Sequence, residues 1–325
     1  MNQYRRTLLS AIAIASVARA ARAQGPAWPT RPVRIVVSGG PGGVADIRAR
    51  WLAERLAPLL GQPVVVENRA GAGGNIGAEF VARIVTDGHT LLVVHQGTLA
   101  VNPHLYPRIG YDPIHDFAPI TRLGVGSLLL AVHTGVRATS VSELIELARA
   151  KPGALSYGSP GIGTPPHLAS ELFVRAADIK ATHIPYKGGG ALVADLIAGH
   201  ITWSIEGMTA QAPHVQAGRL RALAVTTTQR VGSLPDVPTM AEAGVPGYEF
   251  VGWAGLAAPA TTPKPVIARL YAEIAKVLAT AEARDWFATF GAEPGGEPPE
   301  VFADFIRAEH AKWGKVIREA NIKIE

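Results

Sequence analysis

Residues 33–77 have the sequence VRIVVSGGPGGVADIRARWLAERLAPLLGQPVVVENRAGAGGNIG, and this stretch contains the pattern that decides the fold. Residues 33–37 are mostly β-branched, which is typical of a buried strand, and a glycine-rich turn follows them. Residues 44–60 then repeat apolar side chains at helical spacing along one face. A second strand at residues 64–67 leads into another glycine-rich turn at residues 71–77. This alternation of strand, turn and helix predicts an α/β fold.

The same alternation extends toward the C-terminus. A third strand is predicted at residues 91–94, and residues 102–117 form an irregular loop rich in proline and aromatic residues. Two long apolar runs, at residues 120–132 and 250–258, flank a second set of strands and helices, and two amphipathic helices end the chain. We therefore expect two α/β lobes joined by two crossing strands. Ligands of such folds bind in a cleft at the carboxyl ends of the strands.

The length of the chain also favours two lobes. The chain has 325 residues, whereas a single hydrophobic core stops growing at about 250 to 300 residues. We predict a first lobe formed by residues 24–124 and 250–325, and a second lobe formed by residues 125–249.

The first 23 residues are predicted to be a signal peptide. The paired arginines at residues 5–6 precede an apolar stretch at residues 7–18, and Ala-Arg-Ala at residues 21–23 forms a cleavage site before Gln24. The paired arginines favour the twin-arginine export route, and Sec export stays an alternative. No later stretch reaches the roughly 18 apolar residues of a transmembrane helix. The sequence therefore predicts an exported protein of the bacterial periplasm.

The composition excludes several classes of function. The chain contains no cysteine, which rules out disulfides, thiolate catalysis and iron–sulfur clusters. It has 31 basic and 26 acidic residues, and four of the arginines lie in the predicted signal peptide, so the remainder is nearly neutral. A nearly neutral chain lacks the clustered basic face of a nucleic-acid-binding protein. The ten histidines are scattered singly and predict no metal site.

Two glycine-rich turns are the strongest candidates for ligand binding. SGGPGGVAD at residues 38–46 and SPGIGTPPH at residues 159–167 each connect a predicted strand to a helix. Free backbone N–H groups and the positive end of the helix dipole favour an anion there. Because the turns contain no Arg or Lys, we expect a small carboxylate held by N–H groups and by the hydroxyls of Ser159 and Thr164. Asp46 would repel an anion, so it caps the helix, orients a water molecule or contacts an amino group of the ligand.

One enzymatic alternative fits the first turn. The pattern Gly40-x-Gly42-x-x-Ala45 follows a strand and opens a helix, and Glu67 ends the next strand, where it could contact a ribose. This arrangement would make the protein an exported nicotinamide-dependent oxidoreductase. Against this reading, residues 71–77 carry an equally good glycine pattern in the wrong place, and no catalytic pair is evident.

A series of motifs along the mature chain resembles a known family. In order, the motifs are LGQPVVVENRAGAGGNIG at residues 60–77, DGHTLL at 87–92, DFAPI at 116–120, HIPYKGGG at 183–190 and LPDVPTMAEAGVPGY at 234–248. The chain thereby resembles the Bug family, the extracytoplasmic solute receptors of tripartite tricarboxylate transporters. The resemblance covers essentially the whole mature chain.

The resemblance implies a type II-like periplasmic binding protein, a Venus flytrap of two α/β lobes that closes on a small carboxylated solute. It also implies a monomer without a cofactor that delivers the solute to a membrane permease, or in some members to a sensor, rather than catalysing a reaction. The implied ligand contacts are Pro41, Gly42, Gly43, Val44, Asp46, Thr98, Ser159, Gly163, Thr164, Lys187 and Glu206.

Two departures from the family's pattern bear on specificity. Members commonly carry a proline–phenylalanine pair where this chain has Ser38 and Gly39, so the pocket wall is enlarged or reshaped. We expect a bulkier ligand such as an aromatic carboxylate, or a different way of binding the same ligand, unless a neighbouring side chain fills the gap. Glu206 stands where an aspartate is frequent, and its longer side chain either contacts a cationic group of the ligand or faces solvent.

Overall fold

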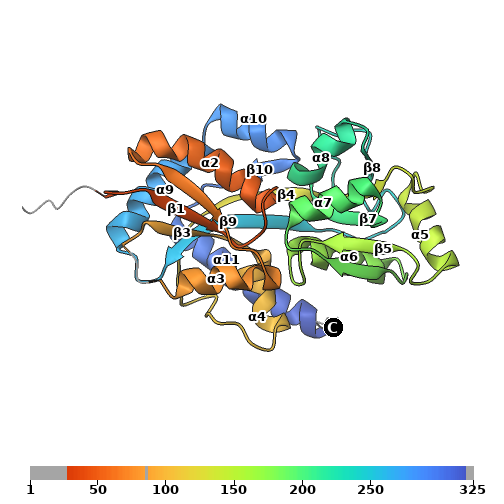
Figure 1. The fold of residues 1–325 in the computed structure, drawn as a ribbon, viewed down its shortest axis with the longest axis horizontal. Helices are drawn as coiled ribbons and strands as arrows, with labels where there is room; N and C mark the ends of the chain where they lie inside the picture. Colours follow the sequence, from red (N-terminus) through yellow and green to blue (C-terminus); the bar gives the residue numbers. More distant parts are fainter. Residues whose placement is uncertain (1–27, 85–86, 320–325) are drawn as a thin grey trace, which may run out of the picture.

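The computed structural model describes residues 28–84 and 87–319. Within these residues the chain forms an elongated molecule with two α/β lobes side by side (Figure 1). The predicted signal peptide lies outside the described residues. No described helix is both long and apolar enough to cross a lipid bilayer.

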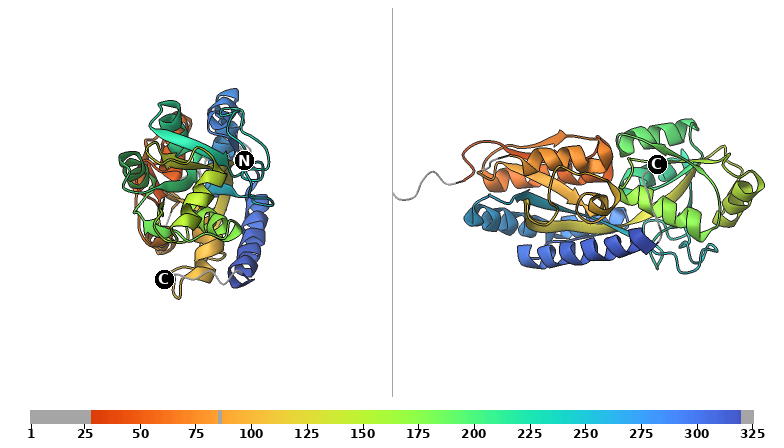
Figure 2. Two further views of the ribbon diagram at one scale, coloured as in Figure 1. Left: turned by 90° about the vertical axis from the view of Figure 1, so that its right-hand side faces the viewer. Right: turned by 90° about the horizontal axis from the view of Figure 1, so that it is seen from below.

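The first lobe is built on a mixed sheet with helices on both faces. Its strands are β1 (Val33–Val37), β2 (Val64–Asn68), β3 (Thr90–His95), β9 (Val251–Pro259) and β10 (Ala292–Pro294). Its helices are α2 (Val44–Leu60), α3 (Asn75–Ala82), α9 (Lys264–Leu278), α10 (Ala281–Thr289) and α11 (Pro299–Glu319). Because side chains alternate along a strand, Ile35 and Val37 of β1 pack in the core with α2, α9 and α10, whereas Val36 packs in the core with α3 and α11. In the right-hand view of Figure 2, α11 lies along this lobe in dark blue.

The second lobe repeats this arrangement on a smaller scale. Its strands are β5 (Ser156–Ser159), β6 (Thr182–Pro185), β7 (Trp203–Gly207) and β8 (Leu220–Val225), and its helices are α5 (Val141–Ala150), α6 (Pro165–Ala176), α7 (Gly189–Ala198) and α8 (Met208–Gln216). β5 pairs in parallel with both β6 and β7. Leu192 of α7 and Met208 of α8 pack on one face of this sheet, and Phe173 of α6 packs on the other.

One strand belongs to both lobes. β4 (Phe117–His133) pairs with β9 as far as Ser127 and with β7 from Leu128 onward. The chain returns to the first lobe at Phe250, whose N–H donates to the carbonyl of Thr226 just before β9 begins. The predicted architecture of two α/β lobes joined by two crossing segments is confirmed.

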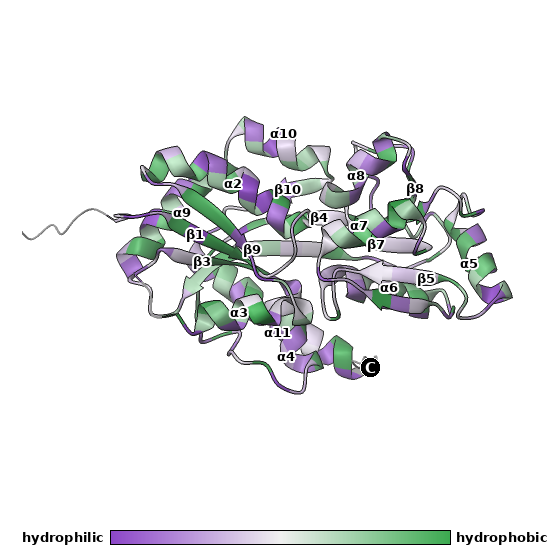
Figure 3. Cartoon of the chain, in the orientation of Figure 1, coloured by the Kyte–Doolittle hydropathy of each residue, from purple (hydrophilic) through white to green (hydrophobic). Residues whose placement is uncertain are grey.

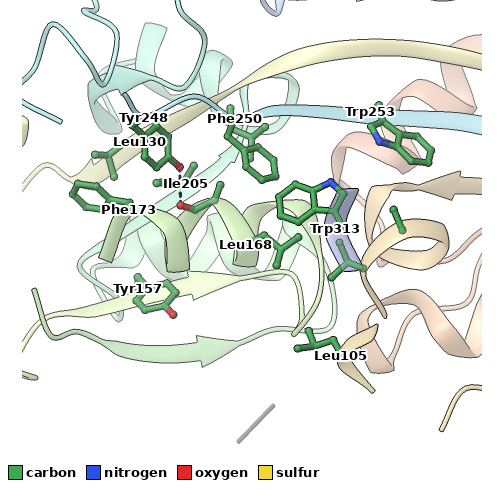
Figure 4. Packing of buried hydrophobic residues seen from close by; sticks show 14 of the residues in the cluster. Leu105, Leu130, Tyr157, Leu168, Phe173, Ile205, Tyr248, Phe250, Trp253 and Trp313 are labelled. Atoms are coloured by element: carbon green, nitrogen blue, oxygen red, sulfur yellow. Dashed lines mark hydrogen bonds between the residues drawn. The ribbon is translucent and has the colours of Figure 1, made fainter. Parts of the chain in front are cut away.

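The lobes share one hydrophobic cluster. Trp313 of α11 and Leu105 belong to the same cluster as Leu168 of α6 in the other lobe (Figure 4). In the same region the hydroxyl of Tyr248 donates to the carbonyl of Ala169 over 2.7 Å. Figure 3 shows β1 in green, at the hydrophobic end of the scale, whereas the helices alternate between green and purple along their lengths. The cluster therefore ties the C-terminal helix to both lobes.

Three short helices differ from the sequence-based expectation. α4 (Asn102–Leu105) lies where an irregular loop was expected, α8 follows β7 directly, and α10 makes a third helix at the C-terminus where two were expected. These helices have 4, 9 and 9 residues, which is shorter than the window of about 11 to 18 residues that reveals helical periodicity. α8 also contains Pro213 in its interior, and proline disfavours a helix when tertiary packing is ignored.

Candidate functional site

A cavity lies between the lobes, where the carboxyl ends of parallel strands from both sheets converge. It is lined by the turns that follow β1, β2, β5, β6 and β7, together with the middle of β4 and the start of β9. Its volume is about 130 Å³. An engineered protein cavity of roughly 150 Å³ holds a benzene molecule, so this cavity has the size of a small organic ligand.

Five helices direct their N-termini at the cavity. They are α2, α3, α6, α7 and α8, and their N-cap residues Gly43, Gly74, Thr164, Gly188 and Gly207 all line it. Four of these residues are glycines, and Thr164 makes no side-chain cap hydrogen bond, whereas Ser140 and Thr280 cap α5 and α10 away from the cavity. First-turn N–H groups that no side chain caps can bind a ligand, and the helix dipole favours an anion there. At the starts of α3 and α8, the N–H groups of Asn75 and Gly207 are already bound by the Ala72 carbonyl and the Glu206 carboxyl. α6 begins with two prolines and so contributes fewer N–H groups than the other four.

The two lobes touch at glycines beside the cavity. A Cβ atom on Gly40 would lie 2.5 Å from the carbonyl oxygen of Lys187, and one on Gly190 would lie 2.4 Å from that of Pro41. Real Cβ atoms do not approach an oxygen so closely. The turn after β1 and the turn after β6 therefore meet across the lobe boundary only because both lack side chains at these positions.

Asp46 is compensated within its own lobe. Its carboxylate accepts the Gly42 N–H over 3.0 Å and forms an ion pair with Arg50 at 2.9 Å. Burial raises the pKa of Asp46, but the hydrogen bonds from Arg50 and Gly42 outweigh this effect and hold the pKa below its ordinary value. The sequence left three roles open, and the structure shows a fourth: the Asp46 carboxylate closes the turn before α2 through Gly42, and it does not cap α2 by a side-chain hydrogen bond.

Arg48 is a buried cation in the cavity wall. Its side chain is only 5% exposed, its Nη1 lies 3.4 Å from the carbonyl oxygen of Gly124, and its Nε has no partner. Gly126 leaves room for the guanidinium, since a Cβ atom there would lie 2.9 Å from Nη2. Burial lowers the pKa of Arg48 to about 10, so the group is still charged at neutral pH. No carboxylate among the described residues pairs with it.

Glu206 is a buried carboxyl in the wall of the second lobe. It is 3% exposed, its Oε1 accepts the Gly207 N–H over 2.7 Å, and its Oε2 has no partner. Burial raises the pKa of Glu206 to about 7, against the opposing effect of the Gly207 hydrogen bond. Of the two orientations considered from the sequence, the solvent-facing one is wrong, because the side chain lines the cavity.

The structure brings some of the predicted contacts together and leaves others aside. Gly43, Val44, Asp46, Thr164, Lys187 and Glu206 line the cavity. Pro41 and Gly42 lie at the contact between the lobes, where Gly190 approaches them.

Three predicted contacts lie behind the cavity wall. The hydroxyl of Ser159 lies 2.7 Å from Nε2 of His183, the N–H of Gly163 donates to His167, and the hydroxyl of Thr98 donates to the carbonyl of His95. These three residues do not line the cavity. Which of the predicted residues touch a ligand stays a prediction.

Several cavity residues were not predicted. They include Arg48, His95, Ser127, Thr209 and Trp253. His95 ends β3 and Thr209 follows β7, so the rule that ligands bind at the carboxyl ends of strands could have found both. Ser127 and Trp253 lie on the crossing strands, and no sequence signal marks them.

The geometry also bears on the oxidoreductase alternative. The Glu67 carboxylate is paired with both Arg34 and Arg69, and it does not line the cavity. The carboxylate that the oxidoreductase alternative assigns to a ribose is therefore already held by two arginines.

Within residues 28–84 and 87–319, no three His, Asp or Glu side chains gather as metal ligands would.

Comparison with known sequences identifies relatives along nearly the whole chain. A sequence profile described as the tripartite tricarboxylate transporter family receptor, TctC, matches residues 48–322. The chain is 41% identical over 317 residues to a UPF0065 protein in the tcbD-tcbE intergenic region of Pseudomonas sp. (strain P51), covering 97% of this chain and 94% of that protein. It is 37% identical over 326 residues to BugT of Bordetella pertussis, covering 100% of each.

Solved structures agree with these relatives. R. palustris Rpa4515 with adipate has a TM-score of 0.88 at 39% identity, over 91% of this chain and 99% of that one. The periplasmic binding protein BugD has a TM-score of 0.88 at 33% identity, over 92% of this chain and 100% of that one. MatC from Rhodopseudomonas palustris with bound malate has a TM-score of 0.85 at 31% identity, over 89% of this chain and 100% of that one. The chain therefore belongs to the TctC family of tripartite tricarboxylate transporter receptors, whose members are periplasmic solute-binding proteins.

Proposed function

We propose that this protein captures a small organic carboxylate in the cavity between its lobes and delivers it to the permease of a tripartite tricarboxylate transporter. The observation that carries the proposal is the convergence of five helix N-termini from both lobes, none capped by its own side chain. Such termini favour an anion through their N–H groups and dipoles. Adipate and malate, carried by two similar structures, support a carboxylate as that anion.

The proposed mechanism is differential binding between an open and a closed state. Cavity residues come from residues 24–124 and 250–325, which we assign to the first lobe, and from residues 125–249, which we assign to the second. A ligand that contacts both lobes gains more contacts in the closed state, so it shifts the equilibrium toward closure. No covalent bond is made or broken, and the closed form is what the permease recognises.

The proposal includes export and leaves one alternative partner. We infer that residues 1–23 are a cleaved signal peptide and that the mature chain begins at Gln24, which Edman sequencing of the periplasmic protein would test. The alternative partner is a sensor protein. Ligand uptake by cells that lack the receptor separates the two, because only the permease route makes uptake of the bound solute depend on the receptor.

The first test is the thermal stability of the mature chain with a panel of ligands. The panel contains mono-, di- and tricarboxylates, amino acids, aromatic acids and NADPH. A ligand present at about a hundred times its Kd stabilises the folded state by roughly 2.7 kcal/mol, which a melting curve resolves. Stabilisation by a carboxylate supports the proposal. Stabilisation by NADPH and by no carboxylate would overturn it in favour of the oxidoreductase.

A further inference from the structure

Arg48 is a buried cation without a carboxylate partner among the described residues. A guanidinium has five N–H donors, and among the described residues this one contacts the Gly124 carbonyl at 3.4 Å and the face of Phe287, whose ring centre lies 5.2 Å from Cζ. Neither partner carries a negative charge. The residue is the fifth of α2, so its charge lies near the positive end of the helix dipole, where a cation is disfavoured. A buried charge without a counter-charge is strongly unfavourable. An anion that enters the cavity would supply this counter-charge, because Arg48 lines the cavity wall.

Glu206 lacks a hydrogen-bond donor in the same cavity. Its Oε1 is bound by the Gly207 N–H, and its Oε2 is buried without a partner. Gly189 of α7 leaves the space beside Oε2 open, since a Cβ atom there would lie 3.5 Å from that oxygen. The second lobe thus presents one free carboxyl oxygen to the cavity.

The other ionisable groups of the cavity do not supply these partners. The carboxylate of Asp46 is taken by Arg50, burial holds the pKa of His95 at about 4 and keeps it neutral, and the side chain of Lys187 is exposed. Arg48 and Glu206 do not pair with each other either. A cation and an ionisable carboxyl group therefore line one cavity from two lobes, and each has a hydrogen-bonding atom, Nε of Arg48 and Oε2 of Glu206, without a partner among the described residues.

We propose that Arg48 and Glu206 select an amino-substituted carboxylate, with Arg48 binding a carboxylate of the ligand and Glu206 binding its ammonium group. The inference rests on the proposed function, since it names the class of carboxylate that the same cavity takes. A carboxylate and an ammonium group on one ligand would compensate the charge of Arg48 and fill the open Oε2 of Glu206 at once. A dicarboxylate without an amino group would compensate Arg48 but place a second anion beside Glu206, where like charges repel.

Calorimetric titration with matched ligand pairs tests the selection. The pairs are aspartate with succinate, glutamate with glutarate, and phenylalanine with 3-phenylpropanoate, and malate replaces the amino group of aspartate by a hydroxyl. We expect the amino member of the best-bound pair to bind at least tenfold more tightly than its partner. Equal affinity within each pair would overturn the inference, and so would malate binding as tightly as aspartate.

Two variants assign the selection to the named residues. Glu206→Gln should abolish the preference for the amino member while carboxylate binding persists. Arg48→Met should weaken the binding of both ligands of the pair at least tenfold. It should not lower the melting temperature of the free protein, since it removes an uncompensated charge. Glu54→Gln, on the exposed face of α2, is the control and should change neither quantity.

The outcomes separate this inference from the proposed function. If no carboxylate of the panel binds, the proposed function fails and the inference fails with it. If carboxylates bind but the Glu206→Gln variant keeps the same preference, only the inference fails. An Arg48→Met variant that binds both members normally also overturns it.

Discussion

At the scale of single residues, neighbouring charges on one helix have different environments. Asp46 and Arg50 are four positions apart on α2, and the ion pair between them is what this spacing favours. Arg48 lies between them in the sequence but contacts Gly124, which is 76 positions away. The charge pattern of α2 therefore predicts the local pair, and only the tertiary contacts reveal that Arg48 is buried without a counter-charge.

The buried carboxyl of Glu206 should make stability depend on pH. Its pKa in the folded protein, about 7, lies above the ordinary value of 4.5, so the folded state holds a proton that the unfolded state releases between these values. This contribution, at most about 3 kcal/mol, is fully present below pH 4.5 and is lost as the pH rises through 7. The Glu206→Gln side chain stays neutral. The melting temperature of this variant should therefore exceed that of the parent protein by a margin that grows from pH 5 to pH 8. A constant difference in melting temperature between variant and parent across this pH range would contradict the prediction. Glu54→Gln serves as the control.

The carboxylate of Asp46 should stabilise the turn before α2. Asp46→Ala removes the acceptor for the Gly42 N–H and the ion pair with Arg50, and we expect a loss of about 1 to 2 kcal/mol in urea denaturation. Asp46→Asn keeps an acceptor for the Gly42 N–H, so this variant should lose less unfolding free energy than Asp46→Ala. An alanine variant as stable as the parent would show that the turn holds without this side chain.

At the scale of elements, local signals determined some boundaries and failed at others. α2 has the predicted bounds because a glycine precedes it and Gly61, in the left-handed conformation with φ 68°, ends it. α8 has neither a side-chain cap nor an amphipathic stripe, and its residues become helical because they pack against β4 and β8. Short helices that depend on packing are therefore the ones that sequence periodicity misses.

The turn after β1 should control closure through Gly40. A Cβ atom on Gly40 would collide with the carbonyl of Lys187 in the other lobe, whereas one on Gly39 would meet nothing within 4 Å. Gly40→Ala should therefore weaken ligand binding at least tenfold, because the closed state must open to admit the methyl group. Gly39→Ala is the matched control and should bind normally. Titration calorimetry measures both, and equal affinities for the two variants would refute the role of this contact.

At the scale of the whole molecule, a direct hydrogen bond joins the two lobes beside the cavity. The hydroxyl of Tyr106 in the first lobe donates to the carbonyl of Ile162 in the turn after β5, at 2.9 Å. This hydrogen bond joins the lobes directly. Under the proposed mechanism, we expect it to favour the closed state even before a ligand contributes its own contacts.

Removing this hydrogen bond should shift the molecule toward the open state. A neutral hydrogen bond is worth about 1 kcal/mol, so Tyr106→Phe should lower ligand affinity roughly fivefold and increase the radius of gyration of the free protein in X-ray scattering. Tyr271→Phe on α9, far from the lobe boundary, should leave both unchanged. An unaltered affinity in the Tyr106 variant would mean that the contact does not contribute to closure.

The sequence by itself determined the α/β class, the two lobes with their crossing segments, and the receptor family. These follow from patterns that are local or repeated along the chain: strand, turn and helix in succession, long apolar runs, and motifs such as VVVENRAGAGG at residues 64–74. The glycine-rich turns also predicted Val44 and Thr164 as cavity residues, since the carboxyl ends of strands are where such cavities form.

Only the tertiary structure decided which polar groups in the cavity lack partners. Asp46 and Arg48 are both charged residues at the start of one helix, and the first is satisfied while the second is not. Glu206 is an isolated acid in the sequence and becomes a buried carboxyl beside the lobe boundary. The physical reason is that burial and hydrogen bonding depend on groups from distant segments and from both lobes, which are brought together only when β4 and β9 complete the fold.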